Sequence, residues 1–269
     1  MGLFKDDAKK SKQVEESDKI LDENSPFFVK EAYKMARTNI LFSMPDATAK
    51  TILITSAFPA EGKTTTAINI SISFAQMGYK VLLIDADVRK STVRKRLNYG
   101  KQKGLTDVLG GLCTLEEVIV PNSDVPNMSV MQSGTIPPNP SELLSSQKMK
   151  DVIEKCAQMF DYVFVDAPPV NVVTDAVVIS RNMSGVLLVV RANYSATQAV
   201  MMAVNKFNMA NAHLLGFVLN ASTFLGYGYN KYGYSYSNRY MNYKYNYSYE
   251  YGKDEKTKKT GSSKKHKDQ

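Results

Sequence analysis

The sequence predicts a doubly wound α/β fold, with a mostly parallel sheet between a disordered polar arm and a disordered tyrosine-rich tail. Three observations support this prediction. Short apolar runs alternate with stretches of helical periodicity from residue 51 onward. The runs at 81–84 and 162–165 are apolar throughout, as expected for strands covered on both faces. A Gly-Lys-Thr loop follows the first run, at a strand's carboxyl end, where such sheets bind ligands.

The chain has 269 residues and 43% hydrophobic residues, which suits one domain with a sizeable core and tails. We expect a polar arm over 1–24, a domain over 25–225, a tyrosine cluster over 226–251 and a basic tail over 252–269. The arm is followed by Ser25-Pro26, which predicts a helix over 27–41. Strands are expected at 51–56, 80–85, 128–132, 161–166, 185–190 and 214–219, and helices at 63–77, about 91–97, 104–118 in pieces, 141–159, 174–182 and 196–210.

Composition excludes several classes of protein. The only cysteines, Cys113 and Cys156, have no Cys/His cluster around them, which argues against a disulfide framework and a zinc site. The two histidines, His213 and His266, disfavour catalysis by a His dyad or triad. No apolar run approaches the roughly 20 residues of a membrane span, and the N-terminus lacks the features of a signal peptide. We therefore expect an intracellular protein whose membrane association would come through a partner.

The stretch 51–66 has the layout of a phosphate-binding loop. An apolar run ends at small residues, a loop with Pro59 and Gly62 follows, and Lys63-Thr64 opens a helical stretch. Backbone N–H groups at such a helix N-terminus face an anion, the lysine reaches the terminal phosphates, and the Thr64 hydroxyl would bind Mg²⁺. The first glycine of the strict pattern falls on Ala57, so an incidental Gly-Lys-Thr at a strand–turn–helix junction is the alternative.

Carboxylates follow two further strands. Asp85 and Asp87 leave the second strand, with Arg89 two residues on, and Asp166 ends the strand at 161–166. Carboxylates at strand ends beside a phosphate loop are placed to hold hydrated Mg²⁺. A single such Asp is often only a turn residue, but two strand ends and the loop together predict a site for a nucleoside triphosphate.

Two more features bear on assembly and base binding. Glu31, Lys34 and Arg37 recur every three residues on the first helix, either as a solvated charged face or as a contact with another subunit. Asn220 follows the last strand, where it would either contact the adenine or form a turn.

The tail is unusual in composition. Eleven of the sixteen tyrosines fall between Tyr227 and Tyr251, and most of the net charge of +8 lies from there to the C-terminus. Without Ile, Val or Leu the cluster cannot bury a core. It could be an RNA-stacking surface, a self-association tail or an array of phosphate acceptors. The candidate acceptors are Tyr227, Tyr229, Tyr232, Tyr234, Tyr236, Tyr240, Tyr243, Tyr245, Tyr247, Tyr249 and Tyr251.

Taken together, these motifs resemble those of the bacterial tyrosine kinases, in the type whose cytoplasmic kinase is separate from its transmembrane activator. S-A-F-P-A-E-G-K-T resembles the Walker A motif of that family, D-A-D-V-R its second acidic motif, and Asp166 its Walker B aspartate. The E-x-x-K-x-x-R of the first helix resembles a subunit-interface motif with Lys34 in place of an arginine. Residues 136–144, I-P-P-N-P-S-E-L-L, also resemble a family segment, to which we assign no chemistry. Eukaryotic kinase signatures are absent.

The resemblance implies a P-loop NTPase fold of the deviant Walker type and an ATP- and Mg²⁺-dependent protein-tyrosine kinase. It would phosphorylate its own tyrosine cluster in trans and regulate capsular or exopolysaccharide synthesis and export. Implied partners are further copies in a ring, a transmembrane activator that recruits the cytoplasmic kinase to the inner membrane face, a protein-tyrosine phosphatase and protein substrates, but no nucleic acid. We expect Lys63, Asp85 and Asp87 to be catalytic, with Asp85 the first candidate for the base. Thr64, Asp166 and Asp85 would hold the metal, and the expected nucleotide contacts are Ala60, Glu61, Gly62, Lys63, Thr64, Thr65 and Asn220.

The sequence leaves two rival functions open. A nucleotide-switched positioning or partition ATPase shares each motif singly, but that group carries an early loop lysine where Phe58 stands, and it has no need of clustered tyrosines. An RNA-binding protein acting through its Tyr/Lys tail would leave the nucleotide site unexplained.

Overall fold

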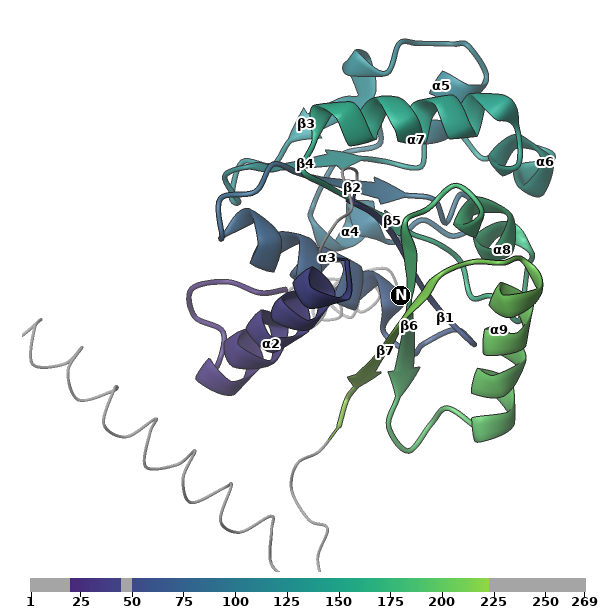
Figure 1. The fold of residues 1–269 in the computed structure, drawn as a ribbon. Helices are drawn as coiled ribbons and strands as arrows, with labels where there is room; N and C mark the ends of the chain where they lie inside the picture. Colours follow the sequence, from purple (N-terminus) through teal and green to yellow (C-terminus); the bar gives the residue numbers. More distant parts are fainter. Residues whose placement is uncertain (1–19, 45–49, 223–269) are drawn as a thin grey trace, which may run out of the picture. The chain divides into compact units, whose positions relative to one another are not determined.

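A computed structural model describes residues 20–44 and 50–222 of the chain. The tyrosine cluster and basic tail lie outside the described residues, as does most of the predicted arm. Within the described part, the central feature is a seven-stranded sheet in the order β3-β4-β2-β5-β1-β6-β7 (Figure 1). The strands are β1 (Lys50–Ser56), β2 (Val81–Asp85), β3 (Ile119–Pro121), β4 (Met128–Met131), β5 (Tyr162–Asp166), β6 (Gly185–Arg191) and β7 (Leu214–Asn220).

Every neighbouring pair of strands is parallel except β3 and β4, so the predicted mostly parallel sheet is confirmed. The edge strand β3 was not predicted, because it has only three residues and ends at Pro121, which cannot donate a ladder hydrogen bond.

The helices are α2 (Phe27–Ser43), α3 (Lys63–Ala75), α4 (Val93–Arg96), α5 (Leu105–Leu109), α6 (Pro140–Leu144), α7 (Gln147–Met159), α8 (Asp175–Ser180) and α9 (Thr197–Met209), with a 3₁₀ turn, η1, at Glu116–Val118. The single helix predicted over 141–159 is two helices. The Ser146 hydroxyl accepts a hydrogen bond from the Met149 N–H at 3.3 Å, so it caps a new helix instead of continuing the old one.

Alternate residues of each central strand face two separate cores. Leu53 of β1 packs in one core with α5 to α9, while its neighbours Ile52 and Ile54 pack in the other with α2, α3 and α4. Figure 1 shows α2 and α3 on one side of the sheet and α7, α8 and α9 on the other. This arrangement confirms the prediction, made from the fully apolar runs, that helices cover both faces.

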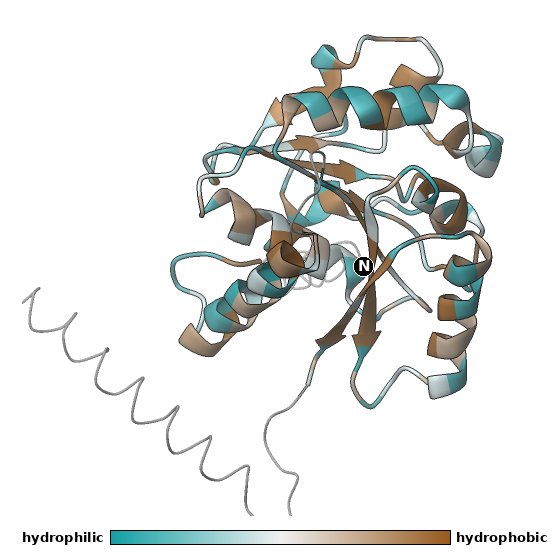
Figure 2. Ribbon diagram, in the orientation of Figure 1, coloured by the Kyte–Doolittle hydropathy of each residue, from teal (hydrophilic) through white to brown (hydrophobic). Residues whose placement is uncertain are grey.

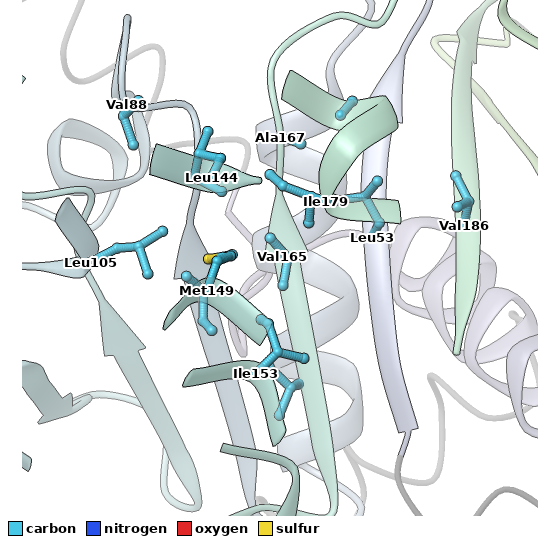
Figure 3. Packing of buried hydrophobic residues seen from close by; sticks show 14 of the residues in the cluster. Leu53, Val88, Leu105, Leu144, Met149, Ile153, Val165, Ala167, Ile179 and Val186 are labelled. Carbon is cyan, nitrogen blue, oxygen red and sulfur yellow. The ribbon is translucent and has the colours of Figure 1, made fainter. Parts of the chain in front are cut away.

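Figure 3 shows the first core from close by, with Met149 and Ile153 of α7 packed against Val165 of β5. In Figure 2 the strands are mostly hydrophobic in colour, while α7 alternates hydrophilic and hydrophobic bands, as a helix with one buried face should.

A residue of the segment predicted as a polar arm packs on the core. Leu21 is buried against the core of α2 and α3, and its N–H donates to Asn69 Oδ1 at 2.8 Å. The sequence did not reveal this contact, because a single apolar side chain in a charged stretch gives no periodic signal, and the boundary of the arm at residue 24 stays a prediction. No helix among residues 20–44 and 50–222 is long and apolar enough to cross a membrane.

Candidate nucleotide site

The phosphate loop connects β1 to α3, and its backbone is bent at two positions. Ala60 and Gly62 both have positive φ, at 65° and 94°. A Cβ added to Gly62 would lie 1.9 Å from Asn220 Nδ2, so this position accepts only glycine without rearrangement. Ala57, which replaces the first glycine of the strict pattern, is fully buried.

Three distant side chains hold the loop in place. Asn220 Nδ2 donates to the Glu61 carbonyl at 2.9 Å, and Arg191 Nη1 donates to the Ala60 carbonyl at 3.0 Å. The buried Glu61 carboxylate accepts hydrogen bonds from the Phe58 N–H and from the Ser195 hydroxyl. The loop is therefore fixed from β6, β7 and the segment after β6 before any ligand binds.

These contacts refine two of the sequence predictions. The side chain of Glu61 serves the loop itself, which leaves its backbone N–H as the group available to a phosphate. Asn220 lines the cleft and braces the loop, and its Oδ1 also accepts the Ala221 N–H at 2.8 Å. Contact between Asn220 and the base stays a prediction.

Lys63, Thr64, Asp87 and Asp166 meet at the N-terminus of α3. Lys63 Nζ lies 3.0 Å from Asp87 Oδ2 and 3.3 Å from Asp166 Oδ1, and the Thr64 hydroxyl donates to Asp166 Oδ2 at 2.7 Å. Burial alone would lower the pKa of Lys63, but the Asp166 and Asp87 carboxylates outweigh it and raise that pKa, which keeps the ammonium charged. Loop and strand ends therefore converge as the sequence predicted.

Asp85 and Asp87 differ in their access to the cleft. Asp87 lines it, whereas Asp85 is fully buried, with one oxygen accepting the Asp87 N–H at 3.1 Å and the other the Ser91 hydroxyl at 2.6 Å. Burial and the nearby Asp166 carboxylate raise the pKa of Asp85 to about 7. Burial likewise raises the pKa of Asp166, with the Lys63 charge opposing it.

The donor set fits a divalent ion that is completed by phosphate and water. Among residues 20–44 and 50–222, no group of three or more His, Cys, Asp or Glu side chains is arranged to hold a metal. Thr64 Oγ1 and the Asp166 carboxylate are nevertheless adjacent oxygen donors beside the phosphate loop. Mg²⁺ is commonly held by one or two protein oxygens with waters and substrate phosphates, so this pair suits it.

The loop lies in a cleft of about 890 Å³. One part of its lining comes from β6 and β7, through Arg191 and Asn220, and another from the segment after β2. The N-terminal part of α2 adds Val29 and Tyr33. The volume is in the upper range for small-molecule sites.

An ion pair that the sequence did not reveal anchors the segment after β2. Arg89 Nε and Nη2 donate to the two carboxylate oxygens of fully buried Asp175 at 2.8 and 3.1 Å, and Ser141 Oγ donates to the same carboxylate at 2.6 Å. Ser141 lies in the unassigned segment 136–144, which thus acquires a structural role. Arg89 in D-A-D-V-R was visible in the sequence, but its partner lies 86 residues away.

The three residues predicted at a subunit interface lie on α2, and the structure does not treat them alike. Lys34 Nζ pairs with Glu31 Oε1 at 2.7 Å within the helix, and both side chains are exposed. Arg37 instead donates from Nη1 to the Ser73 carbonyl at 2.6 Å and to the Ser73 hydroxyl at 3.2 Å, so it holds α2 on α3.

Comparison with known proteins decides the family. A family model described as an AAA domain matches residues 49–215. The tyrosine-protein kinase YwqD of Bacillus subtilis (strain 168) is 38% identical over 204 residues, which cover 76% of this chain and 85% of that protein. CpsD of Streptococcus pneumoniae serotype 4, also a tyrosine-protein kinase, is 38% identical over 210 residues, covering 77% and 90%. The chain belongs to the bacterial tyrosine kinases.

Solved structures agree with this assignment. The kinase domain of the Escherichia coli tyrosine kinase ETK superposes on the kinase with a TM-score of 0.71 at 31% identity, covering 80% of this chain and 87% of that one. The chimerical protein CapA2B2 gives a TM-score of 0.69 at 35% identity, covering 74% and 86%. The septum site-determining protein MinD of Pyrococcus horikoshii, at 24% identity and a TM-score of 0.55, shares only the fold.

These matches confirm the predicted family and the P-loop NTPase fold of the deviant Walker type. The kinase therefore belongs to a group that binds ATP with a divalent metal. A positioning ATPase is the weaker interpretation, because such proteins match this chain at lower identity and coverage than the tyrosine kinases do.

Proposed function

We propose that the kinase transfers the γ-phosphate of ATP, with Mg²⁺, to tyrosines of the C-terminal cluster of a neighbouring subunit. The observation that carries this proposal is the meeting of Lys63, Thr64, Asp87 and Asp166 at the N-terminus of α3, where the first three line the cleft. It supplies the charge and the oxygen donors that phosphoryl transfer requires, and eleven tyrosines in the same chain are candidate acceptors.

The residues of the loop bind and orient the nucleotide. Backbone N–H groups over 60–65 face the phosphates at the N-terminus of α3, and the Lys63 ammonium moves from the carboxylates to the bridge between the β- and γ-phosphates. Thr64 and Asp166 would hold Mg²⁺, with Asp85 behind them. When bound, Mg²⁺ neutralises charge on the β- and γ-phosphates.

In the transfer step, the tyrosine oxygen forms a bond to the γ-phosphorus as the bond from that phosphorus to the bridging oxygen breaks. ADP leaves, and the phenolic proton passes to a carboxylate. Two carboxylates qualify as the base. Asp85 has a pKa raised to about 7, which suits a base at neutral pH, but its side chain is fully buried, whereas Asp87 lines the cleft that an acceptor would enter. A free tyrosine has a pKa of about 10, so base assistance at neutral pH is needed.

Phosphorylation of the cluster would loosen the assembly of subunits. Each phosphate adds about −1.5 to −2 charge, so a phosphorylated cluster repels its neighbours and loosens a ring built through α2. A protein-tyrosine phosphatase would reverse this. We place the kinase in the cytoplasm, recruited to the inner face of the membrane by a transmembrane activator. There it would regulate capsular or exopolysaccharide synthesis and export, and it would phosphorylate further proteins of that synthesis.

The assignment is tested by Lys63→Met. Without the ammonium, charge at the transferred phosphoryl group is unbalanced, so tail phosphotyrosine should fall at least a hundredfold on incubation with ATP, Mg²⁺ and the activator's cytoplasmic segment. Mass spectrometry of the tail measures the signal and identifies the acceptors.

Lys95→Met is the matched control for this experiment, because Lys95 is exposed on α4 and does not line the cleft. It should leave the phosphotyrosine signal unchanged. Tail phosphotyrosine that persists in a clean preparation of Lys63→Met would refute the assignment.

A further inference from the structure

The segment 89–96 contributes two cations to the lining of the cleft, Lys90 and Arg96, for which the proposed transfer step has no use. The segment leaves β2 just after Asp87 and is fixed beside the phosphate loop. The Lys90 N–H donates to Asp87 Oδ1 at 3.0 Å, and the Thr92 hydroxyl donates to Thr64 Oγ1 at 3.1 Å. Lys90, Thr92 and Arg96 all line the cleft.

Arg96 has side-chain nitrogens for which the described part of the chain supplies no partner. Its Nε and Nη1 atoms are buried and have no hydrogen-bond partner there. A guanidinium withdrawn from water without partners is unfavourable, so such donors in a native fold call for an explanation, of which a bound ligand is one. Within residues 20–44 and 50–222, neither Arg96 nor Lys90 forms a salt bridge.

The other cations of the cleft are already engaged. Lys63 pairs with Asp87 and Asp166, Arg89 pairs with Asp175, and Arg191 donates to the loop carbonyl of Ala60. Apart from Arg191, which braces the loop, Lys90 and Arg96 are therefore the cations of the lining whose charges have no acidic partner within residues 20–44 and 50–222, and their charge favours an anion.

The sheet order shows at which end of the cleft this anion would bind. Arg191 and Asn220 end β6 and β7 on one side of β1, whereas segment 89–96 follows β2 on the opposite side, beyond β5 (Figure 1). With the phosphates on the loop and the base near Asn220, the γ-phosphate points toward Asp87. Lys90 and Arg96 then lie on the acceptor side of the reacting atoms.

The spacing of the tyrosines suggests what the anion is. Tyr243, Tyr245, Tyr247, Tyr249 and Tyr251 stand at every second position. In an extended chain, residues i and i+2 project from the same side about 7 Å apart. When one tyrosine enters the site, its neighbour at two residues' distance therefore faces the same wall of the cleft, and arginine is well suited to grip a phosphate with two parallel hydrogen bonds.

We propose that Arg96 and Lys90 form a phosphotyrosine subsite that binds the product of one transfer two residues away from the next acceptor. The cluster would then be phosphorylated in sequence, each phosphotyrosine priming its neighbour. The inference rests on the proposed function, since it takes the tail as the substrate.

The test uses peptides of residues 243–251 in which Tyr247 is the acceptor and all other tyrosines are replaced by phenylalanine. In the primed peptides, position 245 or position 249 carries phosphotyrosine instead. The unprimed peptide has phenylalanine at both positions. Binding of each labelled peptide to the dephosphorylated full chain with ADP and Mg²⁺ is measured by fluorescence anisotropy. Wild type should bind a phosphorylated peptide at least tenfold more tightly than the unphosphorylated one, as expected for charge-assisted hydrogen bonds. Arg96→Gln should abolish that preference, and Lys95→Gln, an equal change of charge outside the cleft, should preserve it.

Kinetics with ATP supply the second readout. In wild type, kcat/KM should be about tenfold higher for the primed peptide than for the unprimed one. Arg96→Gln should bring the two values together, whereas Lys95→Gln should keep the tenfold ratio. Equal binding of both peptides, equal loss for both in Arg96→Gln, or equally tight binding of a peptide with glutamate at the primed position would each overturn the proposal. If unprimed peptide is phosphorylated and priming brings no gain, only this inference fails. If phosphopeptide binding is selective but neither peptide is phosphorylated, the proposed kinase activity fails and the subsite stands.

Discussion

Asp85 is a carboxylate whose surroundings come from a strand, a loop and a helix that are far apart in the sequence. It lies fully buried at the end of β2, level with Asp166 in the parallel register of β2 and β5. The sequence placed both carboxylates at strand ends, and the register brings them together. Their burial was not predictable, since it depends on the loop that carries Ser91 and on Lys63 from another element.

The raised pKa of Asp85 predicts how the stability of the ligand-free kinase depends on pH. The carboxyl titrates near 4 when unfolded and at about 7 when folded, so the folded state binds more protons between these values. Stability should therefore fall as pH rises from about 4 to about 7. Asp85→Asn removes this loss, because its amide oxygen still accepts the Asp87 N–H and the Ser91 hydroxyl can rotate.

In chelator and without nucleotide, Asp85→Asn should unfold at a higher temperature than wild type at pH 8. Its free energy of unfolding should exceed that of wild type by up to roughly 4 kcal/mol at this pH, and the difference should vanish at pH 5. Calorimetric scans across this range measure it. Asp124→Asn, on an exposed loop, should follow wild type at every pH. If the melting temperatures of wild type and Asp85→Asn changed in parallel with pH, burial and the Asp166 carboxylate would not raise the pKa of Asp85.

At the scale of elements, the sequence predicted what repeats along the chain and missed what does not. Apolar runs located the core strands, and helical periodicity after the phosphate loop located the helix at 63–75, within a few residues. The break between α6 and α7 depends on the Ser146 cap, and the short edge strand β3 on pairing with β4, so neither has a periodic pattern. The segment 136–144 was recognisable only by its resemblance to a family segment, to which no chemistry was assigned, although Ser141 ties it to the carboxyl end of β2 through Asp175 and Arg89.

This tie between elements gives the next prediction. Asp175→Ala removes a buried carboxylate that satisfies Arg89 and Ser141, so the kinase should lose about 2–3 kcal/mol of stability. Because the loop after β2 carries Asp87, kcat for the tail should fall several-fold while nucleotide affinity changes little. Denaturant unfolding measures the loss of stability, nucleotide titration measures the affinity, and the rate of tail phosphorylation measures kcat.

The matched control is Asp151→Ala, which removes an exposed carboxylate of α7 whose hydrogen bond comes from Gln147 of the same helix. It should shift stability by no more than about 0.5 kcal/mol. If Asp175→Ala were as stable as this control, the ion pair would not be what positions the segment after β2.

At the scale of the whole molecule, the site depends on contacts between distant parts of the sequence. The hydrogen bonds that brace the phosphate loop join residues 131 to 159 positions apart, through Arg191, Ser195 and Asn220. Motifs predicted that Lys63, Thr64 and the strand-end carboxylates meet beside the phosphate loop, because each motif is local. They could not predict the bracing, because Ser195 and Arg191 lie in stretches with no recognisable pattern and act only once the sheet has formed.

The same distinction separates assembly from folding on α2. This helix exposes large apolar side chains that nothing in residues 20–44 and 50–222 covers, with Phe28 63% and Phe42 78% exposed, and exposed apolar surface of this kind is typical of a binding face. Glu31 and Lys34 share that exposed helix, whereas Arg37 is bonded to Ser73 within the subunit. The double variant Glu31→Ala with Lys34→Ala should therefore weaken assembly and leave the subunit's melting temperature unchanged.

Arg37→Ala should instead lower the melting temperature by several degrees, because α2 loses two hydrogen bonds to Ser73. Size-exclusion chromatography with light scattering measures the assembly, and calorimetry at a concentration where the kinase is monomeric measures the fold. Lys30→Ala, on the same helix, is the control for an altered charge. Should the double variant assemble like wild type while Arg37→Ala loses assembly and stability together, α2 would be a structural helix of the subunit, and the neighbour's tail would have to reach the cleft through another surface.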